Sequence, residues 1–186
     1  MKKYTQDWFS SNIGAFQFFK SYDGPNKKYL EVGSFEGMSM CWMMDNILKG
    51  DNDLGYAVDT FEGGREHSGL NMSEVESNFL HNTEDYRNKV IICKGRSDEQ
   101  LIKLYEDHKE SFDFAYIDGS HDAWDVLSDA VLVFKLVKKG GIIGFDDYGG
   151  GHALHSPKPA IDAFLHTHQN FIKILHSGYQ VWIEKL

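Results

Sequence analysis

Short apolar segments alternate with longer amphipathic segments along most of the chain. The segments with the length and composition of strands are residues 29–32, 56–59, 90–93, 112–118 and 142–145. Each is followed by a stretch with helical periodicity or by a loop that leads into one. This alternation predicts a parallel sheet with right-handed crossovers and helices on both faces. The expected fold is therefore α/β, of the doubly wound, Rossmann-like kind.

The C-terminal part changes this rhythm. Pro157 and Pro159 are expected to open a helix, because proline is favoured in the first helical turn. Residues 171–175 and 179–186 then have the pattern of two strands joined by a short turn. This pattern predicts a hairpin that closes an otherwise parallel sheet.

The N-terminal segment is rich in aromatic side chains, which are Trp8, Phe9, Phe16, Phe18 and Phe19. We expect residues 1–27 to form a helical cap on a single domain spanning residues 1–186. Two interpretations stay open: the aromatic side chains extend the core, or they form a lid over a bound ligand.

Several local patterns give finer predictions. The sequence KVIIC at 89–93 predicts a buried strand, and Ser73 with Glu76 and Ser97 with Gln100 resemble capping boxes at two helix starts.

The helix expected after residue 118 should expose one face and pack the other on the sheet. Its acidic residues Asp122, Asp125 and Asp129 are expected in solvent, and Gly140 with Gly141 is expected to end it. The side chains expected to face the sheet are Trp124, Leu127, Val131 and Phe134.

Composition narrows the class of protein. Of 186 residues, 41% are hydrophobic and 25% are charged, as in a globular protein, and no apolar run approaches the ~20 residues of a membrane span. A net charge of -9 argues against a nucleic-acid partner. The N-terminus lacks the apolar core of a signal peptide, and Cys41 and Cys93 have no metal-type spacing, which favours buried thiols in a cytoplasmic protein.

The sequence YLEVGSFEGMS at 29–39 predicts a strand, a glycine turn and a helix, an arrangement that leaves backbone N–H groups facing a ligand. The spacing of Gly33 and Gly37 is GxxxG, unlike the dinucleotide pattern GxGxxG. Glu36 would oppose a phosphate at the helix start, so a cofactor without phosphates fits better. The alternative is a purely structural glycine turn.

Asp59 ends the second expected strand, at the distance past the glycine loop where an acidic residue takes ribose hydroxyls in nucleotide-binding folds. A helix N-cap is the alternative for this Asp-Thr pair. The turn from Gly95 to Ser97 is expected at the same edge of the sheet.

Asp118, Asp146 and Asp147 follow two strands that should be neighbours. Converging carboxylates repel one another and are stabilised by a shared proton or by a hard cation such as Mg²⁺. The alternative is that they serve only as caps and loop residues.

Histidine is the other candidate chemistry. His121 is a candidate general base in the same loop as Asp118, and His152 and His155 are weaker candidates in a glycine-rich loop. No Cys/His spacing typical of zinc is present.

The motifs EVGSFEGMS, VDTF, KGRS, AYIDGSH and KKGGIIGFDDYG, in this order, resemble class I S-adenosylmethionine-dependent methyltransferases. The branch of macrocin and antibiotic-sugar O-methyltransferases is the most similar, and the resemblance extends from Tyr29 to Leu186. It implies a seven-stranded, mostly parallel sheet with an antiparallel last strand.

The resemblance also implies roles for residues. The implied cofactor-binding residues are Glu31, Gly33, Ser34, Phe35, Gly37, Ser39, Asp59, Thr60, Gly95, Ser97 and Asp118. The implied metal ligands are Asp118, Asp146 and Asp147, with Asp118 or His121 as the catalytic base.

The expected function is methylation of a hydroxyl on a small molecule, such as a sugar or sugar-linked metabolite, with S-adenosylmethionine and Mg²⁺. A metal-independent methyltransferase and a non-catalytic cofactor-binding subunit are the alternatives. The acceptor cannot be carried over from the family, because the long N-terminal helical region of its sugar-modifying members has no counterpart here. The oligomeric state also stays open.

Overall fold

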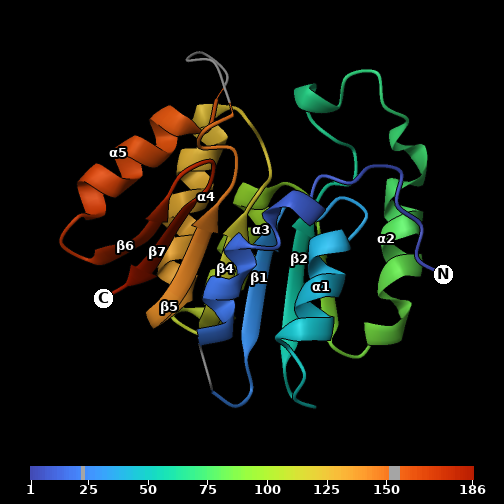
Figure 1. Ribbon diagram of the computed structural model, residues 1–186, viewed down its shortest axis with the longest axis horizontal. Helices are drawn as coiled ribbons and strands as arrows, with labels where there is room; N and C mark the ends of the chain where they lie inside the picture. Colours follow the sequence, from blue (N-terminus) through green and yellow to red (C-terminus); the bar gives the residue numbers. More distant parts are fainter. Residues whose placement is uncertain (22–23, 151–155) are drawn as a thin grey trace.

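Seven strands form one sheet in the order β3-β2-β1-β4-β5-β7-β6 (Figure 1). The computed structural model describes residues 1–21, 24–150 and 156–186. The strands are β1 (Lys28–Val32), β2 (Leu54–Asp59), β3 (Val90–Lys94), β4 (Phe112–Ile117), β5 (Val137–Phe145), β6 (Ile172–Ser177) and β7 (Val181–Lys185). Strands β1 to β5 pair in parallel, and β7 is antiparallel to both β5 and β6. The predicted Rossmann-like sheet with an antiparallel last strand is confirmed.

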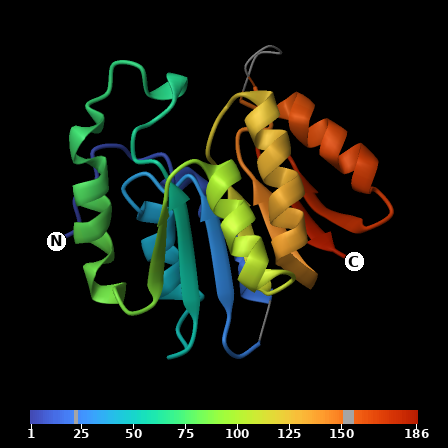
Figure 2. The same cartoon turned by 180° about the vertical axis from the view of Figure 1, so that it is seen from behind.

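Helices cover both faces of this sheet. They are α1 (Met38–Asn46), α2 (Val75–Thr83), α3 (Ser97–His108), α4 (Ala123–Leu136) and α5 (Lys158–His168). Helices α3, α4 and α5 lie side by side on one face (Figure 2), whereas α1 and the N-terminal segment lie on the other (Figure 1). Among the described residues, no helix combines the length and the apolar character needed to cross a membrane.

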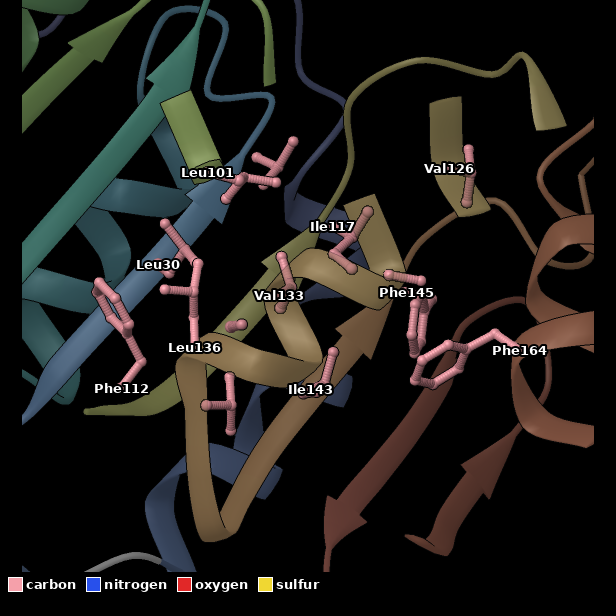
Figure 3. Packing of buried hydrophobic residues seen from close by; sticks show 14 of the residues in the cluster. Leu30, Leu101, Phe112, Ile117, Val126, Val133, Leu136, Ile143, Phe145 and Phe164 are labelled. Carbon is pink, nitrogen blue, oxygen red and sulfur yellow. The ribbon is translucent and has the colours of Figure 1, made fainter. Parts of the chain in front are cut away.

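Each face of the sheet buries its own apolar cluster. Figure 3 shows the cluster beneath α3, α4 and α5, in which Leu30 and Ile143 from the strands meet Val133 and Phe164 from the helices. All four side chains are fully buried. Burial of each such side chain stabilises the fold by roughly 1.5–3 kcal/mol.

The N-terminal segment packs as two 3₁₀-helices, η1 (Ser10–Asn12) and η2 (Ala15–Ser21). In the described part of residues 1–27 there is no α-helix, so the predicted cap is helical only in this tighter form. Phe16 and Phe19 are fully buried against Trp182 of β7, which agrees with the core interpretation. Trp8, in contrast, is half exposed and lines the cleft described below.

Residues 89–93 were predicted to form a buried strand; the strand is present as β3, but it is not buried. Strand β3 is the edge of the sheet, and Ile91 and Ile92 are 37% and 38% exposed. An edge strand has a neighbour on one side only, so even a run of β-branched residues keeps part of its surface in solvent.

The predicted orientation of α4 is wrong for Trp124, Leu127 and Asp129, whereas Val131 and Phe134 pack against the core cluster as expected. Trp124 is 61% exposed, whereas Asp129 is only 1% exposed. The stripe that packs on the sheet is Val126, Ala130, Val133 and Leu136. Helix α4 carries apolar residues on more than one face, so its sequence pattern alone does not define which of them packs on the strands.

Helix boundaries differ in detail from the expected caps. The side chain of Asn71, not Ser73, accepts from the backbone N–H at the start of η4 (Met72–Glu74), and α2 follows it. Ser97 is the first residue of α3 and Arg96 its N-cap, without a side-chain capping bond. Helix α4 ends at Leu136, before the two glycines, which lie within β5.

Candidate functional site

A cleft of about 1270 Å³ opens where the parallel strands end, the edge at which ligands bind in doubly wound folds. The predicted site residues that line it are Gly33, Ser34, Phe35, Ser39, Asp59, Thr60, Gly95, Ser97, Asp118, His121, Asp146 and Asp147. Glu31 and Gly37 do not line it. The fold therefore brings most of the predicted site together from five separate segments.

The glycine loop between β1 and α1 has the tight geometry that its sequence suggested. Gly33 has a φ of +84°, and a Cβ at this position would lie 1.9 Å from the carbonyl oxygen of Asp118. Gly37 has a φ of +78° and caps α1. A Cβ at Gly37 would lie 2.9 Å from the ring of Phe79, so this glycine allows close packing on α2 rather than on a strand.

Asp59 anchors this loop. Its Oδ2 accepts from the backbone N–H groups of Ser34 at 2.6 Å and Phe35 at 2.8 Å, and its Oδ1 accepts from Phe61 at 2.7 Å. The carboxylate therefore holds the end of β2 against the glycine loop while remaining on the cleft wall. A role toward ribose hydroxyls stays a prediction.

Glu31 lies behind the cleft wall rather than on it. Its carboxylate is fully buried and accepts from the hydroxyls of Tyr29 and Ser34, each at 2.7 Å. Burial raises the pKa of Glu31, and hydrogen bonds, among them one from Ser39, oppose this rise. Both carboxylate oxygens of Glu31 accept hydrogen bonds from neighbouring hydroxyls, so this residue supports the glycine loop from below.

Glu36 does not sit at the first turn of α1, which begins at Met38. Its buried carboxylate accepts from the backbone N–H of Thr5 at 2.6 Å, the Thr5 hydroxyl at 3.0 Å and the Asn78 amide at 2.8 Å. The expected opposition between Glu36 and a bound phosphate is therefore replaced by an anchor for the N-terminal segment.

Asp147 follows β5 and holds two side chains of the site. His121 Nε2 lies 2.7 Å from its Oδ2, and the Tyr179 hydroxyl donates to its Oδ1 at 2.6 Å. Burial acts to raise the pKa of Asp147, but the bonds from His121 and Tyr179 outweigh it and the pKa lies below its ordinary value. An ionised Asp147 therefore orients the imidazole, with Nε2–H directed at the carboxylate and the lone pair on Nδ1.

Asp146 is 7% exposed and belongs to a buried polar chain. Its Oδ2 accepts from the hydroxyl of Tyr116 and, at 3.0 Å, from the amide of Asn12. Tyr116 in turn accepts from Gln180 at 2.8 Å. Burial raises the pKa of Asp146, although the hydrogen bond from Tyr116 lowers it in part.

The carboxylate of Asp118 is open to the cleft and makes no hydrogen bond or ion pair within the described part of the chain. The surrounding protein limits the hydration of this carboxylate and thereby raises its pKa. Repulsion from Asp146, Asp147 and Glu31 raises the pKa further. A protonated carboxyl or a nearby cation would relieve this repulsion.

The three acids have the donor chemistry of a magnesium site, since carboxylate oxygens are ligands that Mg²⁺ prefers. Their arrangement does not fit one: in the described ranges, no three His, Cys, Asp or Glu side chains are grouped so as to hold a metal. Hydrogen bonds from the protein already engage both oxygens of Asp146 and of Asp147.

Some site residues were not predicted from the sequence. Asn12 comes from the N-terminal segment, and Tyr179 comes from the turn between β6 and β7; Trp8, one of the aromatic residues expected either in the core or in a lid, also lines the cleft. These segments are distant along the chain, and only the folded hairpin brings Tyr179 to Asp147. His152 and His155 lie outside the described residues.

Residues 30–148 match the family model described as a methyltransferase domain, and the chain belongs to this family. The methyltransferase family predicted from the sequence motifs is thereby confirmed.

Two relatives show how far the similarity extends. The chain is 32% identical over 128 residues to an uncharacterised protein of Acanthamoeba polyphaga mimivirus, covering 69% of this chain and 54% of that protein. It is 25% identical over 154 residues to caffeoyl-CoA O-methyltransferase 1 of Eucalyptus globulus, covering 82% of this chain and 57% of that enzyme. The chain thus spans little more than half the length of these curated relatives.

Solved structures share the fold at low sequence identity. An O-methyltransferase from Bacillus cereus in complex with S-adenosylhomocysteine is 16% identical, with a TM-score of 0.70 over 98% of this chain and 84% of that one. The MycE methyltransferase of the mycinamycin biosynthetic pathway, in complex with Mg and S-adenosylhomocysteine, is 15% identical, with a TM-score of 0.66 over 98% of this chain and 50% of that one.

Proposed function

We propose that the protein transfers a methyl group from S-adenosylmethionine to a hydroxyl of a small molecule, such as a sugar or a sugar-linked metabolite. The observation that carries this proposal is the oriented pair of His121 and Asp147, at 2.7 Å, on the wall of the cleft beside the glycine loop. A cleft of about 1270 Å³ exceeds the volume typical for one small ligand, so it has room for a cofactor and an acceptor together.

The cofactor would lie along the ends of β1, β2 and β3. In this proposal the backbone around Gly33 faces its methionine part, Asp59 takes the ribose hydroxyls, and the turn from Gly95 to Ser97 borders the adenine. The S-adenosylhomocysteine complexes of fold neighbours and the methyltransferase family support this choice of cofactor.

His121 would act as the general base. Asp147 holds the Nε2 side of the ring, and Nδ1 is the nitrogen that would accept the proton of the acceptor hydroxyl. The hydroxyl oxygen would then be free to attack the methyl carbon in line with the carbon–sulfur bond, whose bonding pair would stay on sulfur. Asp118 is the other candidate base, because its carboxylate lies open to the same cleft.

Magnesium dependence is a second proposal. The observation that favours it is that Asp118, Asp146 and Asp147 line the same cleft, and the MycE complex with Mg supports it by analogy. Asp118, Asp146 and Asp147 are the residues that would hold the ion, but their present arrangement does not group them for it, so Asp146 and Asp147 would first have to exchange their hydrogen bonds with the protein. A bound divalent cation would lower the pKa of a coordinated hydroxyl.

Calorimetric titration of S-adenosylhomocysteine, followed by a turnover assay with a panel of hydroxylated small molecules, tests both proposals. Micromolar binding with release of S-adenosylhomocysteine from S-adenosylmethionine supports the methyltransferase, and loss of turnover in EDTA with recovery in Mg²⁺ supports the metal. Binding without any turnover favours the cofactor-binding subunit. Absence of cofactor binding overturns the proposal.

A further inference from the structure

The cleft carries a marked excess of negative charge. Among its described lining residues are eight carboxylates, which are Asp7, Glu36, Asp59, Asp118, Asp122, Asp125, Asp146 and Asp147. Only two lining residues, Arg65 and Arg96, carry a permanent positive charge. A bound divalent cation would reduce this excess without cancelling it.

Both arginines are directed to acids of the same wall. Arg65 Nη1 lies 3.8 Å from Asp122 Oδ1, and Arg96 lies 3.2 Å from Asp98 and 3.9 Å from Asp125. Their side chains are 73% and 63% exposed, at the mouth of the cleft rather than at its base. In the described part of the cleft, neither arginine is left without a carboxylate, as a phosphate-binding arginine would be.

The remaining basic side chains do not change this balance. His121 is paired with Asp147, and His67 Nδ1 accepts from the backbone N–H of Gly64 at 3.0 Å while its ring stacks on Phe35. Asp118, at the ends of the central strands, faces the cleft without a cationic partner in the described chain.

We infer that the cleft selects acceptors that are neutral or positively charged and rejects anionic ones. This inference rests on the proposed function and narrows it: a sugar-linked acceptor would be a glycoside or an aminoglycoside, not a sugar phosphate, a nucleotide-linked sugar or a uronic acid. A carboxylate or phosphate placed in a cleft where carboxylates outnumber permanent positive charges, in a medium of reduced dielectric, is repelled strongly enough to lower affinity at least tenfold. The same field favours the cationic sulfonium of S-adenosylmethionine over neutral S-adenosylhomocysteine.

Comparing S-adenosylmethionine with S-adenosylhomocysteine tests the negative potential of the cleft without any knowledge of the acceptor. We expect S-adenosylmethionine to bind at least tenfold more tightly than S-adenosylhomocysteine at about 20 mM NaCl, and this ratio to fall severalfold at about 300 mM, where screening is stronger. The double variant Asp122→Asn/Asp125→Asn should lower the ratio at low salt. Asp51→Asn, an exposed acid in the loop before β2, is the matched control and should leave it unchanged.

Acceptor triads then test selectivity directly. Each triad shares one hydroxylated scaffold, such as a methyl glucoside, its uronate and its amino-sugar analogue. Equal turnover of the anionic and neutral members overturns the inference, as does a cofactor ratio near one that salt does not change. If neither cofactor form binds, the proposed function itself fails. If both cofactor forms bind but no triad member reacts, the inference stands or falls with the affinity ratio of the two cofactor forms: a ratio that falls with salt supports it, and a ratio near one that salt does not change overturns it.

Discussion

Gly33 lies so close to the backbone of Asp118 that a Cβ atom at position 33 would stand 1.9 Å from the Asp118 carbonyl oxygen. The ends of β1 and β4 are joined here, since the backbone N–H of Asp118 donates to the carbonyl of Val32 at 2.8 Å. One glycine therefore sets the distance between the cofactor loop and the segment that carries Asp118 and His121.

Gly33→Ala should destabilise the fold and weaken cofactor binding together. The added methyl forces the two strand ends apart, and alanine is strained at a φ of +84°. We expect a loss of about 2–4 kcal/mol in the free energy of unfolding, measured with urea. Gly69→Ala is the matched control, because Gly69 also has a positive φ, of +92°, but open space around it. Equal losses in the two variants would show that backbone strain, not the contact with Asp118, is responsible.

His121→Gln should lower kcat by about 10²–10³-fold while S-adenosylhomocysteine affinity stays unchanged, because the ring acts as a base and not as a cofactor contact. Rates are measured under saturating cofactor. If kcat stays within twofold of the wild type, Asp118 becomes the preferred base.

Tyr179→Phe tests whether the hairpin between β6 and β7 positions the base. The variant removes the 2.6 Å bond to Asp147 and leaves that carboxylate with His121 alone. We expect kcat to fall about tenfold with a smaller change in KM, as for loss of one bond to a charged group. Tyr105→Phe, on α3 and away from the cleft, is the control and should behave as the wild type.

Asp59→Ala should lower S-adenosylhomocysteine affinity by at least tenfold, because three backbone N–H groups lose their acceptor and the glycine loop is released. Calorimetry and thermal unfolding are measured on the same samples. Asp53→Ala is the matched control: Asp53 is also buried and accepts from backbone N–H groups of Lys27 and Gly50, but it does not line the cleft. The control should lose stability only. Unchanged cofactor affinity in Asp59→Ala would refute the ribose assignment.

The mostly parallel sheet and the acids at its edge followed from the sequence, because the alternation of strands and helices constrains topology strongly. The burial of individual side chains was predicted less accurately. Ile91 and Ile92 have the composition of a central strand, and their exposure depends on β3 being last in the sheet. Tyr179 and Asn12 reach the site through long-range packing, for which no local motif exists.

In helix α4, the burial of Asp129 was likewise not predicted from the sequence, and it affects how stability depends on pH. Asp129 was expected in solvent, yet it is 1% exposed, and its Oδ1 has no hydrogen-bond partner in the described chain. Burial raises the pKa of Asp129 to about 7, and a hydrogen bond from Ser97 opposes this rise. An acid with a raised pKa keeps its proton in the folded state over a pH range where the unfolded chain has lost it.

Stability should therefore fall as pH rises from about 4 to about 7, and Asp129→Asn should remove this part of the dependence. Below pH 4 both states are protonated, and above pH 7 the folded protein holds a buried charge. At pH 8 we expect the variant to be more stable than the wild type by a few kcal/mol, on the order of 1.4 kcal/mol per pKa unit, with an intermediate difference at pH 5 and little difference at about pH 4. Asp85→Asn, an exposed acid, is the control. The free energy of unfolding is measured for both proteins at several pH values from 5 to 8. If it changes in parallel for the wild type and Asp129→Asn, the raised pKa assigned to Asp129 is contradicted.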